Sequence, residues 1–154
     1  MIEMASWAQF AAEAPDIAAM GRRLLFRNDV GEAFLTTVAG EGLPRTHPIN
    51  VGTVGDRLVA FLLRSPKAND LATDGRFALH AHQDPSAPHE FLLRGRATAI
   101  DDAEARAEAT AAWYFSVSDE YRLFEFSIEH AVLGERGDPD DWPPRYTSWR
   151  STAA

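Results

Sequence analysis

Between residues 32 and 100 the chain alternates short runs of β-forming residues with tight turns that contain glycine. The first run is Ala33-Phe34-Leu35-Thr36-Thr37-Val38, and Gly40-Glu41-Gly42 predicts the turn that follows it. The returning strand is expected over 44–54, a second turn at Gly55-Asp56, and a third strand over 57–63. This alternation predicts a meander of three antiparallel strands and constrains the chain to a mainly β fold.

Three more strands are expected over 76–82, 89–100 and 121–135, and the second of these is expected to bend at Gly95. Residues 136–154, rich in proline, aspartate and tryptophan, are expected to form an irregular tail. A closed barrel leaves no strand edge exposed. The pattern therefore predicts one domain over 1–154, with a six-stranded antiparallel split β-barrel over 32–135.

Helices are expected around the barrel, so that the fold is α+β. Two lie within residues 1–30, where Ser6-Trp7-Ala8-Gln9 has the form of a capping box and Pro15 predicts a second helix start. Short flanking helices are expected over 65–73 and from Asp101 to about Phe115.

Composition excludes several classes of function. The 154 residues contain no cysteine, which excludes disulfides, thiolate catalysis and cysteine-ligated metal centres. The net charge of −8 opposes nonspecific binding to nucleic acid or to anionic membranes. The first ten residues lack the pattern of a secretory signal, and no apolar run approaches the length of a membrane helix. We therefore expect a cytoplasmic protein with no nucleic-acid or membrane partner.

Arg45 and His47 are candidate binding residues because they lie two positions apart in an expected strand. Their side chains then share a face with Ile49 and Val51, which are expected in the core. A cation beside an apolar face needs an anion, since burying it alone is costly. A cofactor phosphate or a nearby carboxylate of the same chain would each supply that anion.

Ser65-Pro66-Lys67 is the second candidate. Ser-Pro is a common helix start, and that structural role is one interpretation. The free N–H groups and positive dipole of a helix start also attract anions, and here Lys67 adds a charge and Ser65 a hydroxyl donor. Arg64 either assists this site or is simply solvated.

These pieces, taken in order, resemble one known family. Phe34 to Val38, the glycine turn, Leu43-Pro44-Arg45-Thr46-His47-Pro48 and Ser65-x-Lys67-x-x-Asp70-Leu71 are similar to the pyridoxamine 5′-phosphate oxidase-like flavin-binding split-barrel family. Asp74 to His80 and Glu90-Phe91-x-x-x-Gly95-x-Ala97 extend the resemblance, which covers roughly residues 32–135.

The resemblance implies a homodimeric split barrel with two FMN sites at the subunit interface. It implies that Arg45, Ser65 and Lys67 hold the cofactor phosphate, and that Thr46, His47, Pro48 and Asn50 line the isoalloxazine edge. Asn50 stands where the oxidase itself carries a basic residue. The basic and aromatic residues that bind the substrate phosphate in the oxidase are also missing around the last expected strand. Pyridoxamine phosphate is therefore not the expected substrate.

Three functions remain open. The sequence lacks nucleophile, Walker and dinucleotide motifs, so a bound cofactor would carry the chemistry. The first hypothesis is an FMN-dependent oxidoreductase that transfers hydride at the flavin, with an unknown organic small molecule as substrate and no assigned catalytic side chain. The alternatives are a deazaflavin-dependent reductase and a non-enzymatic split barrel that binds flavin or haem.

Two further features have competing interpretations. His80 and His82 share a strand face at a spacing that suits iron or zinc, but no third ligand follows at a suitable spacing, so no metal site is predicted. They would otherwise lie near the cofactor or the dimer interface. Trp142 and Trp149 lie in a polar tail, and bulky aromatics there are expected to dock on the partner subunit or the cofactor.

Overall fold

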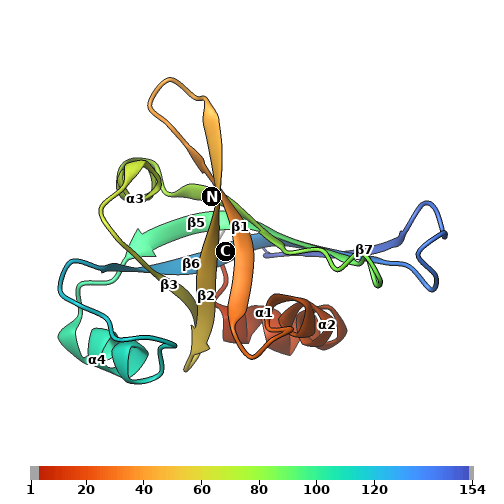
Figure 1. Cartoon of the computed structure of the whole chain (residues 1–154), viewed down its shortest axis with the longest axis horizontal. Helices are drawn as coiled ribbons and strands as arrows, with labels where there is room; N and C mark the ends of the chain where they lie inside the picture. The colour runs from red at the N-terminus through yellow and green to blue at the C-terminus, as the bar shows by residue number, and fades with distance from the viewer. Residues whose placement is uncertain (1–3, 153–154) are drawn as a thin grey trace.

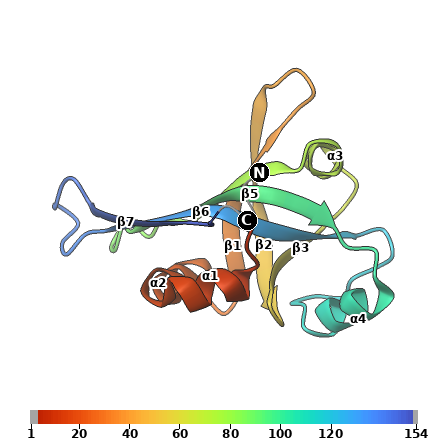
Figure 2. The ribbon, with the colours of Figure 1, turned by 180° about the vertical axis from the view of Figure 1, so that it is seen from behind.

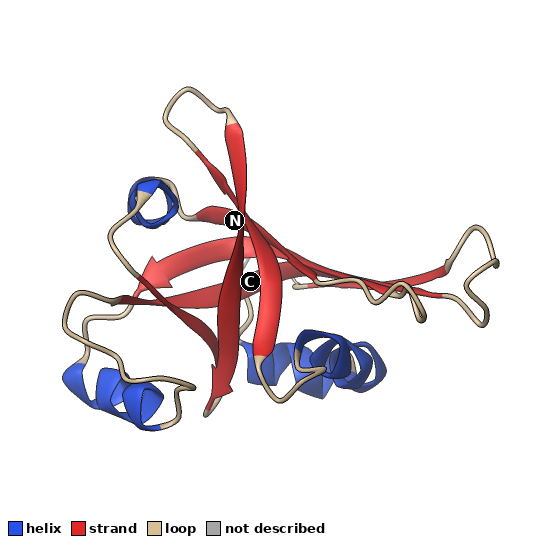
Figure 3. Cartoon of the chain, in the orientation of Figure 1, coloured by secondary structure: helices blue, strands red, loops and turns tan. Residues whose placement is uncertain are grey.

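Six antiparallel strands close a barrel in the order β3-β2-β1-β4-β5-β6, and β3 pairs back onto β6 (Figures 1 and 3). The computed structural model describes residues 4–152. Its strands are β1 (Gly31–Val38), β2 (Pro44–Val54), β3 (Arg57–Leu62), β4 (Arg76–Ala81), β5 (Glu90–Ala99), β6 (Arg122–Glu135) and β7 (Arg145–Arg150). The predicted mainly β, six-stranded barrel is confirmed.

Within the described residues, four helices flank the barrel: α1 (Trp7–Glu13), α2 (Pro15–Leu25), α3 (Pro66–Thr73) and α4 (Ala103–Ala111). The capping box forms as predicted, because Gln9 N–H donates to Ser6 Oγ at 3.1 Å and Ser6 N–H donates to Gln9 Oε1 at 2.8 Å. Figures 1 and 2 show α1 and α2 next to each other beside the lower ends of β1 and β2, while α3 lies beside the upper part of these strands, near the loop that joins them. None of these helices is long and apolar enough to cross a membrane.

The core lies inside the barrel and extends to α1 and α2. Alternate strand residues such as Leu35, Leu79 and Phe91 point inward and are fully buried. Gly21 allows α2 to pack directly on Phe91, because a Cβ at this position would lie 2.3 Å from the Phe91 ring. The barrel and the N-terminal helices therefore share one hydrophobic core.

The prediction of an irregular tail over 136–154 is wrong for residues 145–150, which form β7. The first part of β6 pairs with β3 over residues 122–125, and its last part pairs with β7 over residues 130–135. Past its pairing with β3, this edge of β6 would leave backbone N–H and C=O groups without partners, and β7 supplies those partners. Trp149 turns inward and packs on Phe10 with ring centroids 5.2 Å apart, so it docks on this chain's own core.

Other element boundaries agree with the sequence within a few residues. The bend expected at Gly95 is confirmed as a register shift between Arg94 and Gly95 in the pairing of β5 with β6. The α4 helix ends at Ala111, short of the predicted Phe115. Beyond it the Tyr114 hydroxyl donates to Val51 C=O at 2.7 Å and accepts from Gly31 N–H at 3.0 Å, so tertiary bonds replace further helix.

Candidate functional site

Strand β2 presents its predicted site residues on two opposite sides. Arg45 and His47 lie half-buried on the side that continues into the core, as the sequence predicted. Thr46, Pro48 and Asn50 alternate with them and point to the outer side of the barrel.

Arg45 has a carboxylate partner within the chain. Its Nε donates to Asp70 Oδ2 at 2.7 Å, and the hydroxyl of Thr37 donates to the same oxygen at 2.8 Å. Thr37 is fully buried and the Asp70 side chain is only 10% exposed, whereas the Arg45 side chain is 38% exposed. Of the two anion sources left open by the sequence, the structure supplies the carboxylate.

The Arg45 guanidinium nevertheless keeps free donors. Only Nε is engaged, and the two terminal nitrogens make no hydrogen bond to any residue between 4 and 152. A guanidinium carries five N–H donors in a planar fork, which matches phosphate oxygens. Asp70 therefore binds Nε of the Arg45 guanidinium, and the two terminal nitrogens remain available to an anion.

Helix α3 brings Lys67 close to this pair. Asp70 is three residues after Lys67, so both side chains lie on one helix face. The start of α3 contributes the positive end of its dipole. In the described part of the chain Lys67 has no ion-pair partner. We call Arg45, Lys67 and the first turn of α3 the cationic corner.

Ser65 begins α3 and uses its hydroxyl for that purpose. Its Oγ accepts from Ala68 N–H at 3.3 Å and donates to the carbonyl of Leu63 at 2.9 Å. The residue is the helix N-cap, as its sequence context predicts. Its hydroxyl hydrogen is already engaged. Pro66 has no N–H and the N–H groups of Ala68 and Asn69 are bonded to Ser65, so the ammonium group and the backbone N–H of Lys67 are the donors that stay free at the start of α3.

The outer residues of β2 form a separate group. Asn50 Nδ2 donates to the carbonyl of Gly31 at 3.1 Å, and the hydroxyls of Thr46 and Thr36 lie 2.9 Å apart. Pro48 is paired in register with Phe34, a residue that is 42% exposed. The seven predicted cofactor residues therefore divide between the inner corner and the outer sheet face, and a ligand that touches all of them would have to span the hairpin.

Asp70 and Thr37 are the residues that sequence reasoning left without a role. Asp70 stands three residues after Lys67 in the quoted motif, and this i to i+3 spacing already places it on the lysine's side of the helix. Thr37 gave no comparable signal, because threonine is an ordinary strand residue.

The histidines do not assemble a metal site. His82 Nδ1 lies 3.3 Å from Glu32 Oε2, and His80 Nδ1 lies 2.7 Å from the carbonyl of Ala81. The His82 ring packs against the ring of Phe34, with 4.3 Å between centroids and an angle of 31° between the ring planes. Among residues 4–152 no group of three or more His, Cys, Asp or Glu side chains is placed to hold a metal ion.

Trp142 differs from Trp149 in that it does not join the core. It is 73% exposed, and the Arg136 guanidinium lies 4.9 Å from its ring centroid. The expectation that it docks on a partner or a cofactor stays a prediction.

Comparisons with known proteins place the fold. No family model and no curated protein matches the sequence. Among solved structures, a haem-binding protein from Mycobacterium smegmatis is similar with a TM-score of 0.63 and 19% identity, over 86% of this chain and 57% of that one. This chain therefore spans little more than half the length of that protein.

Two other structures match over most of both chains. One is a pyridoxamine 5′-phosphate oxidase-related, FMN-binding protein from Nostoc punctiforme, with a TM-score of 0.59 and 15% identity over 94% of this chain and 97% of that one. The other is a NimC/NimA family protein from Clostridium acetobutylicum, with a TM-score of 0.60 and 18% identity over 85% of this chain and 94% of that one. At these identities the comparisons establish a shared fold.

Proposed function

We propose that this chain belongs with the pyridoxamine 5′-phosphate oxidase-like proteins, whose split-barrel fold it shares. On that premise we propose that this chain is an FMN-binding oxidoreductase of that family, whose substrate is an organic small molecule. The observation that carries the proposal is the cationic corner, where Arg45, bonded to Asp70 of α3, and Lys67 in the first turn of that helix both keep N–H donors free.

The residues present fit a phosphate ester. Two cations with unused donors, together with the free backbone N–H of Lys67 at the positive end of the α3 dipole, match the charge and the acceptor oxygens of a phosphate. Asp70 lies beside them, but it is bonded to both Arg45 and Thr37 and so serves as a fixed part of the scaffold. The protein has a net charge of −8, yet this corner holds two cations with free donors. A bound phosphate would account for that local positive charge.

Bound FMN would supply hydride transfer through its isoalloxazine ring. This chain's own residues would bind the phosphate through Arg45 and Lys67 and hold Arg45 in place through Asp70. His47 is the predicted ring neighbour that lies on the same side of β2 as Arg45. No acid–base side chain is assigned.

The proposal includes a homodimer that acts in the cytoplasm. Leu43 and Leu63 are 68% and 46% exposed and lie two residues before Arg45 and Ser65, so apolar surface flanks the cationic corner on two segments. A second subunit that covered these side chains would remove them from water and enclose the cofactor. Light scattering of the purified protein, with and without FMN, measures the mass; a monomer under both conditions would contradict this part.

The direct test is an absorbance and fluorescence titration of the purified protein with FMN, a deazaflavin cofactor and haem, each added separately. FMN is expected to bind in the micromolar range or tighter. Preference for deazaflavin or for haem would replace FMN by one of the two alternatives left open by the sequence. If none of the three binds, the oxidoreductase proposal fails.

A double variant tests whether the phosphate of FMN binds at the cationic corner. Arg45→Ala combined with Lys67→Ala should remove most FMN affinity, because each charge-assisted hydrogen bond contributes about 1.5–3 kcal/mol. Riboflavin, which lacks the phosphate, should bind the double variant as it binds the wild type. Arg23→Ala with Arg145→Ala, which removes two exposed charges elsewhere, is the control. Unchanged FMN affinity in a folded Arg45→Ala/Lys67→Ala protein would place the phosphate elsewhere.

A further inference from the structure

A second cationic surface lies on the outer face of the sheet, on strands β4 to β7 instead of on β2 and the first turn of α3. In the strand register Arg94 of β5 is opposite His130 of β6, which is opposite Arg150 of β7. Arg96 is two residues from Arg94 on the same face, and its register partner on β4 is Arg76. Directly opposed like charges destabilise a sheet, so this arrangement has a cost in the isolated chain.

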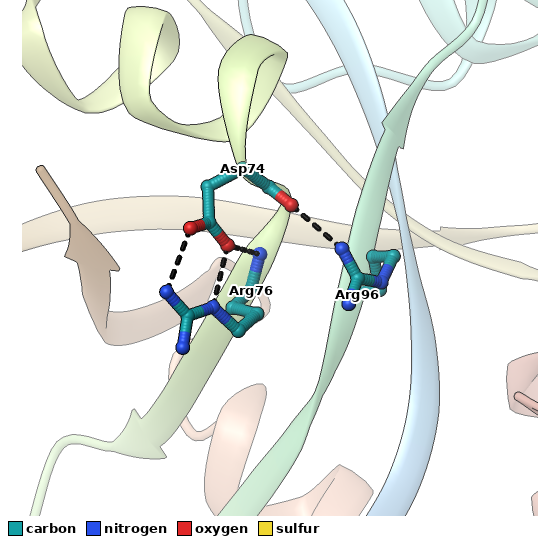
Figure 4. Close-up of polar contacts among 3 residues, drawn as sticks. All are labelled: Asp74, Arg76 and Arg96. Atoms are coloured by element: carbon teal, nitrogen blue, oxygen red, sulfur yellow. Dashed lines mark hydrogen bonds and ion pairs between the residues drawn. The ribbon is translucent and has the colours of Figure 1, made fainter. Parts of the chain in front are cut away.

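Only one of these arginines is neutralised by a carboxylate. Figure 4 shows Arg76 donating to both carboxylate oxygens of Asp74, from Nε at 2.6 Å and from Nη2 at 2.7 Å. In the same view Arg96 reaches only the backbone carbonyl of Asp74, at 2.7 Å. Within residues 4–152 no carboxylate lies within ion-pair distance of the three remaining members, which are Arg94, Arg96 and Arg150. All three are exposed.

We propose that Arg94, Arg96 and Arg150 form a binding site for a compact small molecule that carries several phosphate or carboxylate groups. Neighbouring strands are about 4.8 Å apart and alternate residues of one strand about 7 Å apart, so the site spans about 10 Å by 7 Å. That area suits an oligophosphate group. A nucleic acid would extend far beyond it over a surface of net charge −8, which repels it.

His130 reports on the charge of this site. Burial lowers its pKa, and the charges of Arg150 and Arg94 lower it further, while Glu129 acts in the opposite direction. His130 Nδ1 lies 3.0 Å from Nη2 of Arg94, an arrangement in which the neutral ring accepts from the guanidinium. An anion bound to the arginines would offset their repulsion, so the pKa of His130 should rise on binding.

The test is a calorimetric titration with tripolyphosphate at low ionic strength. Micromolar binding is expected, and Arg94→Ala combined with Arg150→Ala should weaken it by roughly tenfold for each arginine. The control Arg23→Ala with Arg145→Ala removes the same charge elsewhere and should bind within a few-fold of wild type. Equal losses in the two double variants, or no binding by the wild type, would overturn the proposal.

Two more measurements separate this site from the others. NMR titration of the His130 ring in the wild-type protein should show a raised pKa with tripolyphosphate present, and an unchanged pKa would contradict binding beside it. Lys67→Ala should keep tripolyphosphate affinity, because the cationic corner is a different place; loss of affinity there would assign the anion to the flavin site. If a polyglutamate peptide binds much tighter than tripolyphosphate, the surface is a protein-binding one and the small-molecule proposal fails.

Discussion

Arg45 and Asp70 are joined through Nε and Oδ2 at 2.7 Å, and this bond ties the protruding β1–β2 hairpin to helix α3. Figure 1 shows the two elements side by side at one end of the barrel. Thr37 completes the link from β1 by donating to the same carboxylate oxygen. The guanidinium is therefore oriented before any ligand arrives, and preorganised charges bind with less loss of side-chain entropy.

This relationship predicts a difference between two substitutions of Asp70. Asp70→Ala removes the acceptor for both Arg45 and Thr37, so FMN affinity should fall by roughly tenfold and stability by about 1–3 kcal/mol. Asp70→Asn keeps an acceptor oxygen and should retain FMN affinity within a few-fold of wild type. FMN and riboflavin titrations of both variants measure the effect, which should be confined to FMN. Equal FMN affinity in the Ala and Asn variants would show that Asp70 does not orient Arg45 for the phosphate.

Ser65→Ala separates helix capping from phosphate binding. Loss of the N-cap should lower the free energy of unfolding by about 1 kcal/mol. FMN affinity should change little, because the hydroxyl already donates to the carbonyl of Leu63. Urea unfolding and flavin titration measure the two effects, and Ser65→Asp should restore the cap. A large loss of FMN affinity at unchanged stability would mean that the hydroxyl turns to the ligand.

Gly52→Ala should destabilise the barrel. A Cβ at Gly52 would lie 2.6 Å from the ring of Trp113, and overpacking of this kind costs about 1–3 kcal/mol. Gly40→Ala is the matched control, because a Cβ there meets no atom within 4 Å. Urea unfolding of the two variants should show a lower midpoint for Gly52→Ala alone. Equal midpoints would indicate that Trp113 moves aside freely.

Asp74 should make stability depend on pH in acid. Its hydrogen bonds from Arg76 lower its pKa from 3.8 to about 2 in the folded protein. A carboxyl with a depressed folded-state pKa stabilises the protein above its unfolded pKa, and that contribution is lost as the pH falls from about 4 towards 2. Asp74→Asn should therefore flatten the decline of the melting temperature over this range. Because the pair is exposed, the effect should be small. A decline as steep as that of the wild type would exclude Asp74 as a contributor.

Much of the fold could be predicted from local pattern. The alternation in 32–63, the turn glycines and the Ser6 and Ser65 caps each act over a few residues, so they specify strands and helix starts without knowledge of the rest. The tail was the exception. Tyr146, Ser148 and Arg150 alternate with Thr147 and Trp149, but the proline-rich and aspartate-rich surroundings hid this pattern. Residues 145–150 form a strand because they pair with the otherwise free edge of β6.

The candidate site was less predictable, because it depends on distances between segments. The sequence alone determined that Arg45 needs an anion and that a cation stands at the start of α3. Tertiary structure decided that Asp70 is the partner, that Arg45 keeps its outer donors, and that Thr46, Pro48 and Asn50 face away from the corner. Packing of α3 against β1 sets these relationships, and a contact between segments more than twenty residues apart leaves no periodic trace in the sequence.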